Sequence, residues 1–135
     1  MRDIPDAVRS VLEQEPDVAY AVLFGSGGRG ALRPTSDVDV ALEFGAGGAP
    51  DAGRLGLLAA RLEAAAGRPV DLVLMHEAAA PLAYRIFRDG SLLLERDHEA
   101  MARRKAQAIL QYLDFKPVEE RCAEGVLRVA AVGRG

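Results

Sequence analysis

The sequence predicts a single-domain α/β (α+β) fold, in which a mixed β-sheet of about four strands is packed with helices. Three observations predict it. The chain has 135 residues, the length of one domain. Short apolar runs of strand length alternate along it with longer amphipathic stretches of helical period. Half of the residues are hydrophobic and 27% are charged, a composition too apolar for intrinsic disorder.

The N-terminal part of the chain predicts one helix and two strands. The helix covers residues 4–15, because apolar residues recur there at helical spacing. These apolar residues are Ile4, Val8, Val11 and Leu12. Residues 18–24 form a continuous apolar run, which is typical of a buried strand. Residues 37–44 alternate between apolar and polar, which predicts a second strand, and the glycine-rich residues 25–36 connect the two.

The rest of the chain predicts alternating helices and strands. Leucine spacing indicates a helix over residues 55–66, followed by a strand over residues 70–75. A short helix over residues 79–87 and a short strand over residues 92–94 come next. A long amphipathic helix over residues 102–113 completes the pattern.

These elements place the predicted domain in residues 1–117, with residues 118–135 as a C-terminal segment that has no clear pattern of elements. The charge run Arg103-Arg104-Lys105 on the last helix is expected to face solvent. The net charge of −3 argues against a protein dedicated to binding duplex nucleic acid, which needs clustered basic residues.

Cysteine content and hydropathy indicate the compartment. Cys122 is the only cysteine, so no internal disulfide can form and a reducing compartment is favoured. The longest charge-free run has 11 residues, whereas a membrane span needs about 20. The N-terminus has no apolar signal sequence. We therefore expect a cytoplasmic protein that does not bind membranes.

Three carboxylates interrupt the apolar strands. Asp37 and Asp39 are two residues apart on one strand, so their side chains leave the same face. Asp71 interrupts a different strand that could lie alongside. Acids gathered on one face repel one another unless a cation lies between them, and Mg²⁺ is the usual oxygen-ligated ion. From the acids alone, the alternative that Asp37 and Asp39 are simply solvated at a strand end stays open.

The glycine-rich connection before the acid pair has the composition of a phosphate-binding loop. Gly25 and Ser26 follow a buried strand directly, where backbone N–H groups and a hydroxyl can approach a phosphate. Arg29 adds a permanent positive charge. The loop matches neither a Walker A motif nor a G-x-G-x-x-G fingerprint. Ten residues separate Ser26 from Asp37, so a phosphate loop leads directly to a candidate metal-binding pair.

These motifs resemble the G-S-x10-D-x-D signature of the minimal nucleotidyltransferases of the DNA polymerase β superfamily. Leu23-Phe-Gly-Ser26, Arg29-Gly30 and Ser36-Asp-Val-Asp39 carry the resemblance, and Val70-Asp71-Leu72 matches the position of the family's third carboxylate. Within the superfamily, the chain is most similar to MntA-type antitoxins. Those proteins are encoded with HEPN-domain ribonuclease toxins (HepT) and inactivate them by transferring AMP to a toxin tyrosine. The sequence departs from the family at Gly27 and Gly28, where a large basic residue and a small one are common.

The resemblance implies a nucleotidyltransferase fold, ATP as substrate and two Mg²⁺ ions. The implied catalytic and metal-binding residues are Asp37, Asp39 and Asp71. The implied nucleotide-binding residues are Gly25, Ser26, Arg29 and Ser36. The implied partner is a HepT-type HEPN toxin bound in a hetero-oligomer, with no direct contact to nucleic acid.

Two other functions stay open at this level. One is a non-catalytic antitoxin that binds and occludes the toxin, an alternative that the two glycines after Ser26 keep open. The other is a nucleotidyltransferase that acts on a small molecule such as an aminoglycoside. Such enzymes usually carry an extra helical domain, for which 135 residues leave no room unless another subunit supplies it. The presence of all three acids favours an enzyme.

Overall fold

The computed structural model describes residues 3–25 and 37–114 of the chain. The elements are α1 (Ile4–Glu13), β1 (Val18–Phe24), β2 (Val38–Phe44), α3 (Ala52–Ala66), β3 (Val70–Leu74), α4 (Ala80–Asp89) and β4 (Ser91–Glu95). A C-terminal helix follows, of which residues 98–114 are described. The predicted helices and strands within these ranges are confirmed and differ only at their ends. Ser26, Arg29, Ser36 and the segment 118–135 with Cys122 lie outside the described residues.

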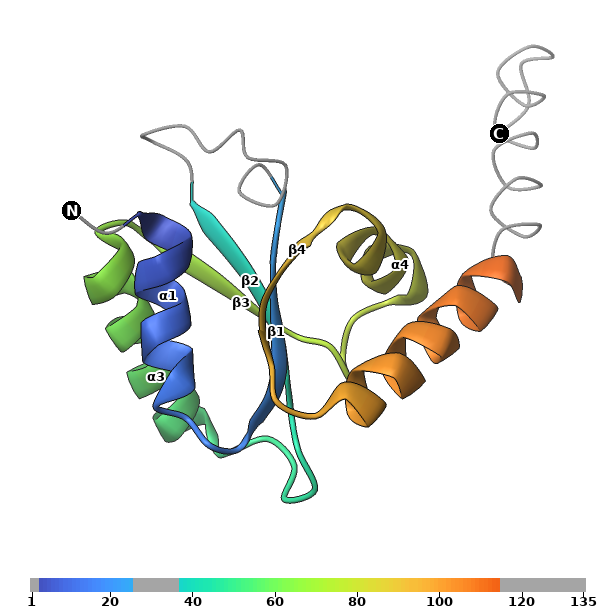
Figure 1. Cartoon of the computed structure of the whole chain (residues 1–135), viewed down its shortest axis with the longest axis horizontal. Helices are drawn as coiled ribbons and strands as arrows, with labels where there is room; N and C mark the ends of the chain where they lie inside the picture. Colours follow the sequence, from blue (N-terminus) through green and yellow to red (C-terminus); the bar gives the residue numbers. More distant parts are fainter. Residues whose placement is uncertain (1–2, 26–36, 115–135) are drawn as a thin grey trace, which may run out of the picture.

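The described strands form one four-stranded mixed sheet in the order β3-β2-β1-β4. β1 is antiparallel to both β2 and β4, whereas β2 and β3 are parallel. A parallel pair needs a crossover connection, and α3 supplies it. Figure 1 shows α1 and α3 on one face of the sheet, and α4 with the C-terminal helix on the other. The predicted α/β class and mixed sheet are confirmed.

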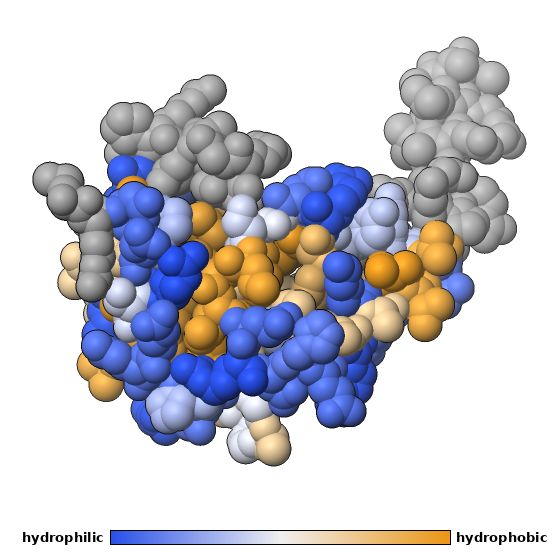
Figure 2. Space-filling view, in the orientation of Figure 1, coloured by the Kyte–Doolittle hydropathy of each residue, from blue (hydrophilic) through white to orange (hydrophobic). Residues whose placement is uncertain are grey.

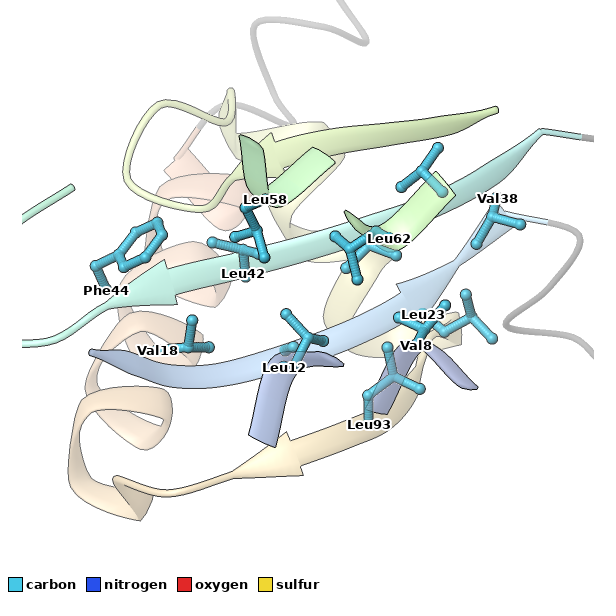
Figure 3. Packing of buried hydrophobic residues seen from close by; sticks show 13 residues of the cluster. Val8, Leu12, Val18, Leu23, Val38, Leu42, Phe44, Leu58, Leu62 and Leu93 are labelled. Carbon is cyan, nitrogen blue, oxygen red and sulfur yellow. The ribbon is translucent and has the colours of Figure 1, made fainter. Parts of the chain in front are cut away.

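The larger core lies between the sheet and the helices α1 and α3 (Figure 3). Alternate residues of β2 point into it, and leucines of α1 and α3 meet them from the opposite side. The fully buried members include Leu12, Val38, Val40, Leu42 and Leu62. Burying each such side chain contributes about 1.5–3 kcal/mol. This core fixes β2, the strand that carries the acid pair at its start.

The opposite face of the sheet contains a part-buried polar network that attaches the C-terminal helix. The Tyr20 hydroxyl donates a hydrogen bond of 2.7 Å to Oε1 of Glu43. Arg104 donates from Nε to the same oxygen at 3.0 Å and from Nη2 to Oε2 at 3.1 Å. Burial, followed by the hydrogen bond to Glu43, raises the pKa of Tyr20 far above its ordinary value. The expectation that Arg104 faces solvent is therefore wrong, because the part-buried carboxylate of Glu43 binds it.

A single glycine joins α4 to β4. The Gly90 amide donates to the carbonyl oxygen of Ile86 at 2.8 Å and ends the helix. A Cβ atom on Gly90 would overlap Cγ1 of Val22 and the Ile86 oxygen. Only glycine lets β4 pair with β1 directly after α4. This close approach keeps α4 against the end of β1.

None of the helices in the described ranges has the length and apolar character needed to cross a membrane.

Candidate functional site

Two of the three predicted acids lie side by side on neighbouring strands. Asp39 of β2 and Asp71 of β3 are Cα partners in the parallel register, next to the first residues of both strands. Asp37 lies immediately before β2. Asp39 shares its strand face with Ala41, which packs on the α4 side of the sheet, and Asp71 shares a face with Val73, which does the same. The acids therefore gather at one end of the sheet, on the face that α4 covers.

The electrostatics of Asp39 show that these groups interact. Its pKa is raised, first by burial, then by the negative charges of Asp71 and Asp37, and by a side-chain hydrogen bond with Asp71. Each cause disfavours the charged form of a carboxyl group. A cation between the carboxylates would reverse the effect, because it favours the ionised form of each oxygen ligand.

The glycine-rich connection begins in contact with the same acid. Phe24, the last residue of β1, is the register partner of Asp39. Gly25 follows with φ of +66°, and a Cβ atom there would overlap Oδ2 of Asp39. A residue with a side chain would be strained and would displace the carboxylate. The structure thus joins Gly25 to the acids, while the other nucleotide-binding candidates lie outside the described residues.

The three carboxylates are chemically suited to bind a hard divalent cation. Asp37, Asp39 and Asp71 offer only carboxylate oxygens, the ligands that Mg²⁺ prefers, and their mutual repulsion calls for positive charge. Within residues 3–25 and 37–114, no group of three or more His, Cys, Asp or Glu side chains is arranged to hold a metal ion. The metal site stays a prediction.

Two cavities lie against α4, and the smaller one reaches Gly25. One, of about 230 Å³, is lined by Phe24, Gly25, Leu82, Arg85, Ile86 and Asp89. The other, of about 540 Å³, follows β3 between α3 and α4, and is lined by Leu55, Gly56, Ala59, Leu72, Val73, Leu74, Glu77, Ala78, Ala79 and Leu82. Leu82 lines both cavities, so α4 separates them.

Arg85 is a candidate site residue that no sequence motif indicates. Its signal is the spacing of the α4 residues that line the smaller cavity, which follow one another at i, i+3, i+4 and i+7. That spacing predicts a shared helix face. The spacing alone does not show which part of the fold that face covers. In the structure, the face covers the end of β1.

Comparison with known proteins identifies the family. Residues 6–99 match the profile of the family described as Polymerase beta, Nucleotidyltransferase. No match to a curated protein sequence was found.

Several solved structures share the fold. A toxin–antitoxin complex with AMP-PNP contains a chain that is 22% identical, with a TM-score of 0.77 over 91% of this chain and 98% of that one. A MntA–HepT toxin–antitoxin structure aligns at 20% identity with a TM-score of 0.71 over 92% and 97%. A tri-AMPylated Shewanella oneidensis HEPN toxin in complex with MNT antitoxin aligns at 20% identity with a TM-score of 0.72 over 92% and 96%.

These similarities confirm at the level of fold the predicted resemblance to MntA-type antitoxins. The family profile covers β1, β2 and β3, and thus the acids and the start of the glycine-rich connection. The chain belongs to the polymerase beta family of nucleotidyltransferases.

Proposed function

We propose that the protein transfers AMP from ATP, in the presence of Mg²⁺, to a tyrosine of a HEPN-family ribonuclease and so acts as its antitoxin. The observation that carries the proposal is the contact of Gly25 with Asp39, which lies in register with Asp71 in a nucleotidyltransferase fold. The fold is shared with an antitoxin bound to a tri-AMPylated HEPN toxin and with a toxin–antitoxin complex holding AMP-PNP, which supports ATP as substrate.

The reaction is a displacement at the α-phosphorus of ATP. The phenol oxygen of the acceptor forms a bond to that phosphorus, the bond to the β-phosphate oxygen breaks, and pyrophosphate leaves. Mg²⁺ ions held by Asp37, Asp39 and Asp71 would supply charge stabilisation and a lowered pKa for the acceptor hydroxyl.

The remaining groups of the chain bind and orient the nucleotide. The backbone N–H groups that begin at Gly25, with the Ser26 hydroxyl, would bind the phosphates, and Arg29 would balance their charge. Ser36 would hold the start of β2 in place. A carboxylate oxygen of Asp71, on the edge strand of the sheet, would accept the proton of the phenol.

A protein acceptor is supported by the surface of the C-terminal helix. Ile109, Leu110 and Leu113 are exposed by 38%, 63% and 59% of their surface. Figure 2 shows an apolar patch over the last described turns of this helix, and Figure 1 shows the helix extending away from the sheet. A contiguous exposed apolar surface is typical of a protein-binding face.

The same apolar surface could also bind the toxin in a purely occluding complex. The test therefore distinguishes transfer of AMP from occlusion. The HEPN ribonuclease is incubated with the protein, with or without Mg²⁺-ATP, and then separated from it and assayed for RNA cleavage. Transfer predicts inactivation that requires Mg²⁺-ATP and persists after separation. Inhibition that needs no ATP and disappears on separation would contradict transfer and favour occlusion.

A further inference from the structure

The smaller cavity beside Gly25 contains a positive charge to which the mechanism above gives no task. Arg85 of α4 lines this cavity together with Phe24 and Gly25. The same Gly25 lies against the carboxylate of Asp39. The cavity therefore borders the first backbone groups that would bind phosphate, and Gly25 lies between it and the carboxylate of Asp39.

The local ion pairs leave the Arg85 charge available. Its Nε donates to the carbonyl oxygen of Pro81 at 3.3 Å, a neutral group of its own helix. Within the described residues no carboxylate forms an ion pair with it. Asp89, the acid that lines the same cavity, is bound by Arg88 through two hydrogen bonds of 3.0 and 2.9 Å. Arg88 thus pairs with the carboxylate of Asp89. Within the described residues, the positive charge of the Arg85 guanidinium is not paired with a carboxylate.

We propose that Arg85 is a further nucleotide-binding residue, whose guanidinium contacts the β- and γ-phosphates of ATP from the α4 side. The inference rests on the proposed function, since it assumes that ATP binds between Gly25 and the acids. A planar guanidinium binds phosphate oxygens bidentately. It also stabilises the negative charge that develops on pyrophosphate as it leaves.

The experiment measures binding of Mg²⁺-ATP and of AMP to the wild type and to Arg85→Gln by calorimetry. Loss of a hydrogen bond to a charged group predicts a Kd for ATP that is higher by about tenfold or more. AMP lacks the β- and γ-phosphates, so its Kd should change little. Pyrophosphate should compete with ATP less well in the variant, and Arg85→Lys should restore part of the binding.

Arg103→Gln is the matched control, because Arg103 is an exposed arginine that lines a different cavity, beside Glu43. Equal melting temperatures without nucleotide would show that both variants fold. Unchanged ATP binding by Arg85→Gln overturns this inference alone. So does an equal loss for ATP and AMP, which would assign Arg85 to the nucleoside. Failure of the wild type to bind Mg²⁺-ATP contradicts the proposed function and this inference together.

Discussion

Gly25 lies so close to Asp39 that no other residue fits without moving the carboxylate. The contact crosses from the end of β1 to the start of β2, because Phe24 and Asp39 are register partners. It links the glycine-rich connection to the acids, which occupy the neighbouring strands β2 and β3.

Replacing Gly25 with alanine should weaken both the fold and the binding of Mg²⁺-ATP. The positive φ alone costs a residue with a Cβ about 1–2 kcal/mol. Gly48→Ala is the control, since Gly48 has φ of +74° but no atom within 4 Å of the added methyl group. Both variants should lose stability in chemical denaturation, but only Gly25→Ala should lose nucleotide binding. Equal nucleotide binding by the two variants would show that the position of Asp39 does not matter for it.

Asp39→Asn should stabilise the protein in EDTA at pH 7. The folded-state pKa of Asp39 is raised, so its ionised form destabilises the fold at all pH values above that pKa. The penalty disappears as the pH falls through the folded pKa and below the unfolded one. The gain in melting temperature from Asp39→Asn should therefore be present at neutral pH and shrink as the pH falls. A gain that grows toward acid pH would contradict the assigned direction.

Tyr20→Phe should cost about 0.5–1.5 kcal/mol, the usual net value of a hydrogen bond. Glu43→Ala should cost more, because it leaves the Tyr20 hydroxyl and Arg104 without their acceptor. Arg103→Ala, on the same helix as Arg104, should change stability by no more than about 0.5 kcal/mol. Urea denaturation of the three variants measures this. Equal losses in Arg103→Ala and Glu43→Ala would mean that the network does not anchor the C-terminal helix.

Gly90→Ala and Gly56→Ala should have opposite effects on stability. A methyl group on Gly90 would overlap Val22 and the Ile86 carbonyl, and overpacking of this kind costs about 1–3 kcal/mol. Gly56 lies inside α3 with nothing within 4 Å, so alanine there should stabilise the helix by up to about 1 kcal/mol. Thermal melts of the two variants measure these changes in stability. A neutral Gly90→Ala would show that β4 shifts easily.

Local patterns in the sequence predict the helices, the strands and the candidate acids, whereas long-range contacts are visible only in the structure. Alternation over residues 37–44 predicts the face that Asp39 shares with Asp37, because a strand has a period of two. The same pattern does not show that Asp71 stands opposite Asp39, since register depends on how β2 and β3 pair. The interrupted apolar run over residues 70–75 indicates Asp71 as a candidate, and the family resemblance assigns it the position of the third carboxylate.

The roles of Arg104 and Arg85 illustrate the same limit. Arg104 belongs to the charge run Arg103-Arg104-Lys105, for which the sequence predicts solvent, and no sequence motif indicates a role for Arg85. Arg104 instead reaches Glu43, 61 residues away, and Arg85 borders a cavity at the end of β1. Helical period shows which residues share a face, but the packing of that face depends on the whole sheet.

The central claim is that Asp37, Asp39 and Asp71 transfer AMP to a partner protein. Intact mass spectrometry of the HEPN partner tests it most directly, after incubation with Mg²⁺-ATP and either the wild type or Asp39→Asn. The account predicts that the wild type adds one or more AMP units to a partner tyrosine, and that Asp39→Asn adds none although it folds and binds the partner. An unchanged partner mass with the wild type, or equal AMP addition by Asp39→Asn, would contradict it.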